Sequence, residues 1–455
     1  MQRKTLIITL SETSVARNIL RTDFWLALKE QKDLRIVLLT TSDMVESFRE
    51  EFGGPNILVE SLLPQHSSFF EKVLAFFARN GMVTETNTLM QHRSYENGES
   101  KIKPWVKWCI GKLFGHVRPL RTLLRALELH ISPTKEVADV FERHNPDLLF
   151  STVCLNVDID TPLLREARRR EVYTVGMVRG WDNLTTYGIL RILPDQFFAQ
   201  NFFLAAQAVN LHDMLSARVS TVGTPFLDLY RREEYYQTRE EYCVELGIDP
   251  SSRILLYAAI GDFLFPKEGE IAEVLESLIE MGSVPKNCIA LFRAHPAFSS
   301  PLERIASLVH VRPERNAEYK TDVLHQWDMK LKHTVRLINT IRHAAVVITA
   351  GSTMMIEGAV LDRPVITVAF DGNSKERYWF SVARFHDMGT HIVDLLKTKG
   401  VRVAHSLEEL GSQIRDYCAN PSLDSEARKK IVERFAGPPD AGKRMAVALL
   451  GILKL

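Results

Sequence analysis

Short apolar runs rich in β-branched residues alternate with longer amphipathic stretches, and this alternation limits the fold more than any other feature of the sequence. TLIITL (5–10), RIVLLT (35–40) and PDLLFSTVC (146–154) each lead into a helical pattern, and VYTVGMV (172–178) follows. Strands and helices in this order predict parallel βαβ units, in which ligands bind at the carboxyl edge of the sheet.

The same alternation resumes near residue 250, with the runs RILLYAAI (253–260), CIALFRAH (288–295), AVVITA (345–350) and PVITVAF (364–370). A chain of 455 residues is too long for one ordinary hydrophobic core. We therefore expect an α/β protein with two Rossmann-like, doubly wound parallel-sheet domains, over residues 1–240 and 241–430.

Composition argues against several classes of protein. A net charge of +1 does not favour a nucleic-acid partner. The five cysteines form no CxxC pair, which fits a reducing compartment and argues against a disulfide framework. No group of histidine, cysteine and acidic residues has metal-ligand spacing, so we expect no metal site. The first apolar run is too short for a signal-peptide core, and no window of about 18 residues is apolar enough to predict a transmembrane helix.

Residues 55–135 fit the alternation poorly, and we expect them to form an insertion in the first domain. Residues 101–126 contain seven lysines and arginines and no acid, and Trp105 and Trp108 are among the large apolar side chains between them. A basic helix with tryptophan on its apolar side can lie in a membrane interface. We expect this segment to contact an anionic membrane peripherally. The alternative is a core-facing helix whose basic face is solvated.

The stretch TAGST (349–353) follows an apolar strand and precedes a helical pattern. Gly351 permits a tight turn there, and Ser352 or Thr353 would cap the next helix. The free N–H groups at such a helix start bind anions, above all phosphate. Glu357, one turn further on, would reach a sugar hydroxyl. Capping by itself also explains the hydroxyls, and a first-turn acid complements the helix dipole.

The stretch LFRAHPAF (291–298) ends another strand at the same predicted edge. His295 would donate to a phosphate oxygen, Arg293 would add positive charge, and Pro296 stops further strand pairing. On its own, a His-Pro pair is more often a satisfied turn histidine. Together with the Ser352–Thr353 turn it predicts a diphosphate site, if the two strand ends are adjacent.

At these residues the sequence resembles the GT-B glycosyltransferase superfamily. The nearest likeness is to bacterial surface-polymer enzymes with an HP motif and a Ser/Thr motif, among them CDP-glycerol glycerophosphotransferase-like proteins and sialyl- and Kdo-transferases. The likeness is carried by two stretches. Residues 343–366 resemble the corresponding GT-B stretch, and residues 218–230 look like the segment with which such proteins leave their first domain. It implies that residues 431–455 form a C-terminal helix that crosses back to the N-domain.

The resemblance implies a metal-independent, inverting enzyme with a nucleotide-sugar co-substrate and no cofactor. His295, Ser352 and Thr353 would bind the donor phosphates, and Glu357 the donor ribose or sugar. The acceptor would be a surface polysaccharide or a lipid-linked carbohydrate, in the cytoplasm at the inner face of the membrane.

Three other functions stay open: an isomerase of the UDP-N-acetylglucosamine 2-epimerase type, a CDP-glycerol-type glycerophosphotransferase, and a GT-B relic that only binds nucleotide sugar. Teichoic-type polymerases usually carry an acid and an aromatic residue just before the Ser/Thr pair. This chain has Ala350 and Gly351 there, which disfavours glycerophosphate transfer.

An inverting transfer needs a base near the acceptor hydroxyl. In RGWDNLTTYG (179–188), Asp182 is the first candidate base. The candidate acceptor ligands in the same loop are Arg179, Trp181 and Asn183. The alternative is an Asx-turn loop in which Trp181 is a packing anchor.

Further candidates follow other predicted strands. Asp158 is a second candidate base, whereas Asp160, just before Thr161-Pro162, is better explained as a helix cap. Ser11 and Arg17 are candidate acceptor contacts, with a plain helix cap as the alternative for their loop. In the second domain, Asp371 would bind a donor-sugar hydroxyl, and Gly261 would line the phosphate site.

Overall fold

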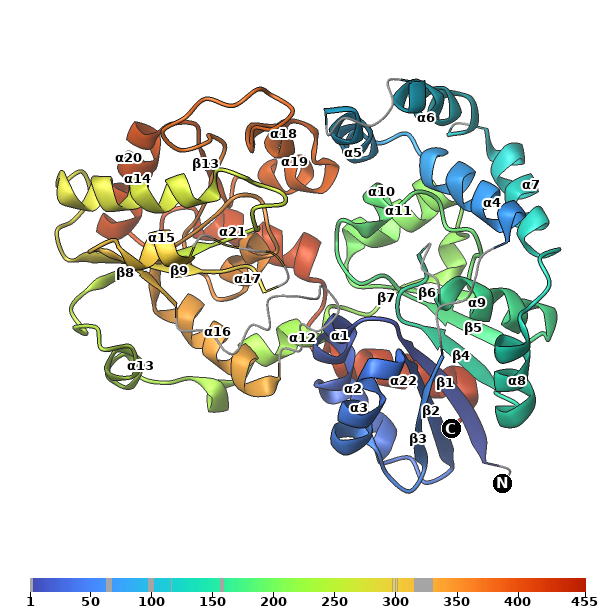
Figure 1. Cartoon of the computed structure of the whole chain (residues 1–455). Coiled ribbons are helices and arrows are strands. Elements are labelled where there is room, and N and C mark those ends of the chain that lie inside the picture. The colour runs from blue at the N-terminus through green and yellow to red at the C-terminus, as the bar shows by residue number, and fades with distance from the viewer. Residues whose placement is uncertain are drawn as a thin grey trace. The chain divides into compact units, whose positions relative to one another are not determined.

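The computed structural model of the chain describes residues 3–62, 68–96, 102–115, 117–155, 159–296, 298, 300, 302–314 and 330–455. The chain divides into two compact units (Figure 1). Unit 1 comprises Met1–Asp228 and Gly437–Leu455, and unit 2 comprises Leu229–Ala436. The division falls before residue 240 because the intervening residues bond within unit 2. Gln237, for example, donates its backbone N–H to Asn339 Oδ1 at 2.8 Å.

Unit 1 is built on a seven-stranded sheet in which all neighbouring strands are parallel. Its strand order is β3-β2-β1-β4-β5-β6-β7. The strands are β1 (Lys4–Leu10), β2 (Leu34–Thr40), β3 (Ile57–Ser61), β4 (Leu148–Ser151), β5 (Tyr173–Gly176), β6 (Gln196–Ala199) and β7 (Val219–Thr221). Strands β1 and β4 are buried along almost their whole length, as expected of a parallel sheet covered on both faces.

Helices connect these strands and cover the sheet. They are α1 (Thr13–Val15), α2 (Asp23–Lys29), α3 (Val45–Phe52), α8 (Lys135–His144), α9 (Asp160–Arg169), α10 (Asn183–Thr186), α11 (Phe202–His212) and α12 (Pro225–Asp228). Single turns of 3-10 or π helix in unit 1 are Ala16–Leu20, Ser42–Met44 and Ser216–Arg218.

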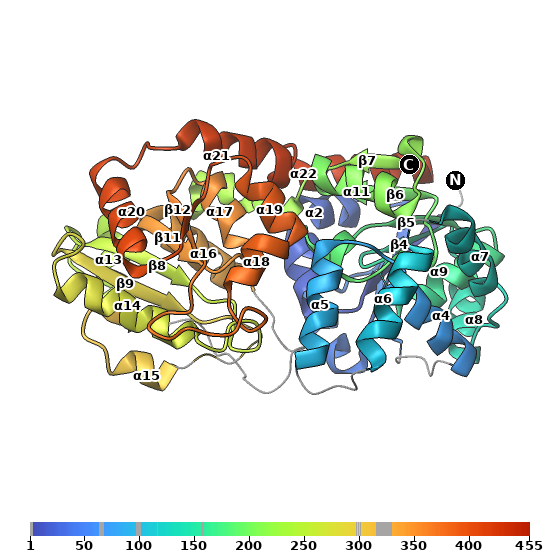
Figure 2. The ribbon, with the colours of Figure 1, turned by 90° about the horizontal axis from the view of Figure 1, so that it is seen from above.

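Four additional helices lie between β3 and α8, in the part of the chain expected to be an insertion. They are α4 (Phe69–Asn80), α5 (Glu85–Glu96), α6 (Ile102–Phe114) and α7 (Arg118–Glu128). Figure 2 shows α5 and α6 beside each other, and the two helices are in contact.

A buried ion network anchors this insertion. Glu71 of α4 and Glu128 of α7 both contact Arg165 of α9, at 2.5 Å and 3.4 Å, and both contact Arg191, at 3.4 Å and 2.5 Å. All four side chains are almost inaccessible to solvent. The charges balance, so the network holds α4 and α7 against the sheet layer of unit 1.

Unit 2 is built on a six-stranded parallel sheet with the order β10-β9-β8-β11-β12-β13. The strands are β8 (Arg253–Ala258), β9 (Cys288–Arg293), β10 (Val311–Pro313), β11 (Ala344–Thr349), β12 (Val365–Val368) and β13 (Arg402–Ala404). Two doubly wound parallel sheets with helical connections confirm the predicted α/β class.

The helices of unit 2 are α13 (Arg239–Leu246), α14 (Glu268–Glu280), α15 (Leu302–Ala306), α16 (Leu331–His343), α17 (Met354–Val360), α18 (Ala383–Met388), α19 (Thr390–Leu396), α20 (Leu407–Ala419) and α21 (Ser425–Ile431). Its single turns of 3-10 or π helix are Leu229–Arg231, Glu233–Tyr235 and Val432–Ala436.

The C-terminal helix α22 (Ala441–Leu453) belongs to unit 1, where it runs beside α2 (Figure 1). Its side chains Met445, Leu449 and Leu453 are buried in the unit 1 core. A Cβ atom at Gly442 would lie 2.8 Å from the backbone nitrogen of Phe24 in α2, so the close approach of the two helices requires glycine.

Candidate functional site

The carboxyl ends of three strands in unit 2 lie level with one another. Thr349 of β11 is in register with Ala258 of β8, and Ala258 is in register with Arg293 of β9. The loops that follow these strands therefore leave the sheet from the same edge. They carry the predicted residues Gly351, Gly261 and His295, so the structure brings these segments to one side of the sheet.

The strands that carry His295 and the Ser352–Thr353 turn are not neighbours, which corrects the expectation of adjacent strand ends. Strand β8 lies between β9 and β11. Parallel strands are about 4.8 Å apart, so the two strand ends are separated by roughly 10 Å. The reason is topological. β8 is the first strand of this sheet, and the later strands extend from it in both directions. The two segments flank the loop after β8.

The turn after β11 is held by hydrogen bonds of its own. Gly351 has a φ of +94°, and a Cβ atom there would lie 2.9 Å from Ile392 Cδ1. The Ser352 hydroxyl lies 2.8 Å from Thr349 Oγ1 and accepts the backbone N–H of Met354 at 3.2 Å. Ser352 is therefore the residue that caps the start of α17, while Thr353 makes no side-chain cap. All three residues of the turn are partly exposed.

Glu357 lies on α17, as expected, and its side chain is buried. Its Oε2 accepts a hydrogen bond of 2.6 Å from the hydroxyl of Tyr230, at the beginning of unit 2. The predicted contact with a sugar hydroxyl remains a prediction, and any such ligand would share the carboxylate with Tyr230.

His295 is uncharged at neutral pH. Burial, and next the nearby charge of Arg293, lower the pKa of its imidazole to about 4. The imidazole ring stacks on Phe298 at a centroid distance of 4.7 Å, and Phe298 stacks on Phe263 at 5.6 Å. A Cβ atom at Gly261 would lie 2.3 Å from Phe298 Cβ, so glycine is required beside this stack. The sequence did not reveal the stack, because its members come from two loops.

Two buried carboxylates that the sequence analysis missed engage the neighbouring groups. Arg293 forms a buried ion pair with Glu314, at 2.7 Å, so its charge is already balanced within unit 2. Glu268 accepts the backbone N–H groups of Ile260 and Gly261 at 2.7 Å and 2.8 Å. The N–H of Gly261 is thus already bonded, which argues against its use for a phosphate. The sequence pointed to Glu268 only by its place at the start of the helix that follows the glycine loop.

Asp371 also has a structural partner. Its buried Oδ1 accepts the backbone N–H of Val382 at 2.8 Å, which fixes the chain just before α18. The proposed bond to a donor sugar remains a prediction for this residue.

In unit 1 the loop after β5 meets the loop after β1. Arg179 forms an ion pair with Glu12 and lies 3.2 Å from the hydroxyl of Tyr187. Burial, and next the charge of Asp182, raise the pKa of Tyr187. Asp182 and Arg179 are both partly exposed, whereas Trp181 is buried. This cluster of two acids, an arginine and a tyrosine contains two predicted site residues, Arg179 and Asp182, and their roles stay predictions.

The remaining predicted residues of the acceptor loops differ in their surroundings. Asn183 is buried, and its Nδ2 donates to Asp182 Oδ1 at 3.1 Å. Ser11 follows β1 and is partly exposed. The guanidinium of Arg17 is buried and lies over the ring of Phe226, 4.4 Å from its centroid.

Asp158 lies outside the described residues. Asp160 does not cap α9 with its side chain, which corrects the expectation for this residue. Its carboxylate is fully buried, where it accepts hydrogen bonds from the hydroxyls of Thr9 and, at 2.6 Å, Ser151. Burial raises its pKa to about 6. Asp160 therefore ties β1 to β4, which the sequence spacing could not show.

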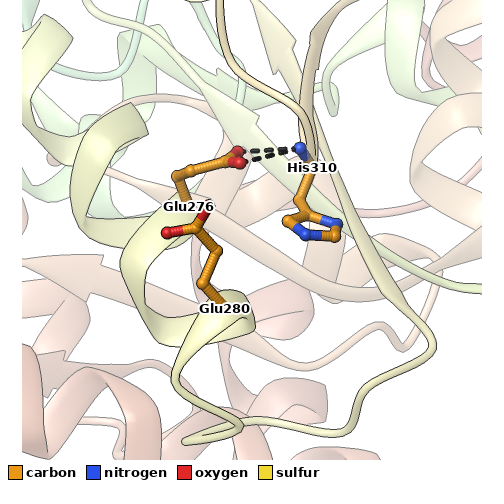
Figure 3. A group of neighbouring side chains, drawn as sticks. All are labelled: Glu276, Glu280 and His310. Atoms are coloured by element: carbon orange, nitrogen blue, oxygen red, sulfur yellow. Dashed lines mark hydrogen bonds between the residues drawn. The ribbon is translucent and has the colours of Figure 1, made fainter.

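Side chains that could hold a metal ion meet elsewhere in unit 2. The ligand atoms of Glu276, Glu280 and His310 lie within 4.8 Å of one another (Figure 3). Both oxygens of Glu276, however, already accept backbone N–H groups, from Val309, His310 and Val311, at 2.8–3.1 Å. Through these bonds Glu276 fixes the turn before β10. His310 directly precedes β10, so the cluster lies at the other edge of the sheet from the strand ends described above.

No protein-family model and no curated protein matches this sequence. Solved structures match over nearly the whole chain. UDP-GlcNAc 2-epimerase from Neisseria meningitidis bound to UDP-GlcNAc has a TM-score of 0.57 and 11% identity, over 98% of this chain and 100% of that chain. A glycosyltransferase from Rickettsia africae has a TM-score of 0.52 and 12% identity, over 100% of both chains.

The calicheamicin glycosyltransferase CalG4 matches with a TM-score of 0.51 and 13% identity, over 100% of this chain and 99% of that chain. Likeness at this level of identity shows the fold. Together with the two parallel sheets, it confirms that this chain has the GT-B fold. Among the residues described, no helix combines the length and the apolar character needed to span a membrane.

Proposed function

We propose that this GT-B protein is an inverting glycosyltransferase that moves a sugar from a nucleotide-sugar donor to a surface-polysaccharide or lipid-linked acceptor. One observation carries the proposal. Three strands of unit 2 end level with one another at one edge of the sheet. The loops that follow them carry the partly exposed Ser352–Thr353 turn, the glycine loop after β8, and His295. In open parallel sheets, ligands bind outside the carboxyl ends of the strands, where the strand order reverses.

The donor diphosphate would lie across this edge. The hydroxyls of Ser352 and Thr353 are on one side of β8, and the imidazole of His295 is on the other. A neutral imidazole has one N–H group and can donate it to a phosphate oxygen. Phe263 is 55% exposed at the end of the aromatic stack, so its ring could carry a nucleobase by stacking. Arg293 is paired with Glu314, and we therefore assign it a structural role.

The chemical step is a displacement at the anomeric carbon. The acceptor hydroxyl forms the new bond to that carbon, a base takes its proton, and the nucleotide diphosphate leaves with the electrons of the broken bond. Asp182 is our candidate base, because it is a partly exposed carboxylate in the loop between β5 and α10 of unit 1. Donors aimed at the departing diphosphate lower the barrier, and this is the role proposed for His295 and the turn at Ser352.

The epimerase alternative shares the fold, so the contacts of the carboxylates must decide between the two. Four acids of unit 2 lie near the edge. Three of them are bonded within the protein: Glu357 to Tyr230, Asp371 to Val382, and Glu268 to the glycine loop. The fourth, Asp262 of the glycine loop, is exposed. An isomerase of this type needs several carboxylates around the sugar ring. These internal bonds favour a transferase. Transfer of glycerophosphate remains disfavoured by Ala350 and Gly351.

A panel of CMP-, CDP-, UDP-, GDP- and dTDP-linked sugars, read by thermal shift, would identify the donor. Calorimetry with the selected nucleotide diphosphate then tests the site. We expect His295→Ala to weaken binding about 10- to 100-fold, since a hydrogen bond to a charged group contributes about 1.5–3 kcal/mol. Ser352→Ala should weaken it in the same direction. His310→Ala is the matched control, because His310 precedes β10 at the other end of its strand.

The products distinguish the functions. Sugar transfer or slow donor hydrolysis supports a transferase, and an isomerised nucleotide sugar formed without acceptor supports an epimerase. Tight nucleotide binding without turnover would indicate a relic. If neither His295→Ala nor Ser352→Ala changes the affinity for the nucleotide diphosphate, the proposed diphosphate site at this edge is wrong.

A further inference from the structure

Helix α6 carries apolar side chains on two sides, and among the described residues contacts to the rest of unit 1 are seen on one of them. The packed side contains Ile110, which is 7% exposed, and Phe114, whose ring lies 5.2 Å from that of Phe77 in α4. Gly111 on this side lets the helix approach the end of α4, since a Cβ atom there would lie 3.3 Å from Asn80 O. These contacts hold the C-terminal half of α6 on unit 1.

The other side of α6 is an exposed apolar stripe. It consists of Ile102, Trp105, Val106, Cys109 and Leu113, at the spacing i, i+3, i+4, i+7 and i+11 of one helix face. Ile102, Trp105 and Leu113 are 65–73% exposed. Trp108 extends the stripe, with its ring 5.8 Å from that of Trp105. Core packing therefore explains one side of this helix, whereas the side with both tryptophans is exposed to solvent.

The positive charges of this part of the chain separate into two groups. Arg118, Arg121 and Arg125 of α7 all form ion pairs with Asp213, at 2.6–3.3 Å, so they hold α7 on unit 1. Lys103, Lys107 and Lys112 are on α6, which has no acidic residue. Lys112 lies over the ring of Trp108, 5.8 Å from its centroid. Lys103 and Lys112 are exposed beside the stripe, and α7 adds positive charge, because its three arginines share one carboxylate and the Arg118 side chain is 74% exposed.

We propose that α6 docks unit 1 onto an anionic lipid bilayer, with the stripe Ile102, Trp105, Val106, Cys109 and Leu113 inserted at the headgroup boundary and the α6 lysines at the lipid phosphates. Tryptophan beside lysine is typical of helices in a membrane interface. Protein interfaces, in contrast, are depleted of lysine, which disfavours a protein partner. The proposal does not depend on the glycosyltransferase activity.

The test is co-sedimentation of the full chain with two kinds of vesicle, pure phosphatidylcholine and an equal mixture of phosphatidylcholine and phosphatidylglycerol. We expect binding to the mixed vesicles only, falling as salt is added, because salt screens the lysines. The double variant Trp105→Ser with Trp108→Ser should bind about tenfold more weakly or less, since its apolar contact is removed. The double variant Lys103→Ser with Lys112→Ser should lose the preference for anionic vesicles.

Two matched controls keep the rest of the surface constant. Phe202→Ser removes another exposed aromatic side chain of unit 1, and Lys29→Ser with Lys32→Ser removes two exposed lysines away from α6. Both should bind as the wild type does. In the unmodified chain, lipids brominated in the acyl chain should quench tryptophan fluorescence, and the Trp105–Trp108 variant should lose this quenching.

The proposal is overturned if the α6 variants and the controls bind equally, or if the chain binds neither kind of vesicle. It is also overturned if light scattering shows a dimer that the tryptophan variant converts to a monomer, because a second copy would then cover the stripe. Binding measured without nucleotide sugar or acceptor separates this result from the outcome of any activity assay.

Discussion

At the residue scale, Glu268 is the group whose protonation should matter most for unit 2. Its carboxylate holds the loop after β8 through the N–H groups of Ile260 and Gly261 and also lies 3.1 Å from the hydroxyl of Tyr257. Burial raises its pKa from the usual 4.5 to about 7. The loop amides favour the charged form, but the loss of solvation outweighs them.

The sign of the pH effect follows from this shift. Because the folded-state pKa is above the unfolded one, the stability that Glu268 contributes is complete below the unfolded pKa. It is lost as the pH rises through about 7, and the total change is about 3 kcal/mol. Other buried groups also titrate, so we compare variants. The difference in free energy of unfolding between wild type and Glu268→Gln should fall between about pH 5 and pH 8.

Urea unfolding at a series of pH values would measure this difference. Glu303→Gln, an exposed acid on α15 of the same unit, is the control and should show a constant difference. A Glu268→Gln difference that is equally constant would place the pKa of Glu268 near its ordinary value.

Asp182 gives a second prediction at this scale. If it is the base, Asp182→Asn keeps the shape of the loop but cannot accept the proton, so turnover should fall about 100-fold or more. Donor affinity should stay the same, because the proposed donor groups are in unit 2. Steady-state kinetics together with calorimetry would separate the two effects. A variant that turns over as fast as the wild type would exclude Asp182 as base and turn attention to Asp158.

At the scale of elements, the insertion α4–α7 depends on its buried ion network. Glu128 is completely buried and contacts Arg165 and Arg191. Removing one partner of a buried ion pair leaves a charge without compensation. Glu128→Gln should therefore lower the free energy of unfolding by about 3–5 kcal/mol, measured by denaturant unfolding.

The control for this prediction is Glu142→Gln. Glu142 has 64% side-chain exposure and contacts Arg170 at 3.4 Å, so its loss should change stability by about 1 kcal/mol or less. Equal effects of the two substitutions would show that the buried network does not anchor the insertion. The comparison also matters for α6, because α4 and α7 support that helix.

At the scale of the whole molecule, the chain returns to unit 1 after completing unit 2. Leu449 of α22 is fully buried in the unit 1 core, whereas Val447 on the same helix is 71% exposed. We expect Leu449→Ala to destabilise unit 1 by about 2–5 kcal/mol, since it leaves a cavity, and Val447→Ala to have little effect. In Leu449→Ala, backbone amides of unit 1 should exchange hydrogen faster than in the wild type, and amides of unit 2 should exchange at the wild-type rate. A uniform change over both units would contradict their separation.

Much of the fold could be predicted from the sequence, because the alternation of apolar runs and amphipathic stretches is a local property. It indicated two parallel sheets, an insertion over residues 55–135, and polar residues at the carboxyl edge of each sheet. The turn at Gly351 and a cap at Ser352 or Thr353 were also readable, because a turn and a helix start depend on neighbouring residues, and the structure shows that Ser352 makes the capping bond.

Only the tertiary structure decided how these local features combine. Strand order placed β8 between His295 and the Ser352 turn, and no local pattern encodes which strands become neighbours. The partners of Arg293 and Asp160 likewise lie on separate segments of the chain: Glu314 follows β10, and Thr9 belongs to β1. Periodicity determines which face a residue occupies, whereas the pairing of buried charges depends on contacts between elements far apart in sequence.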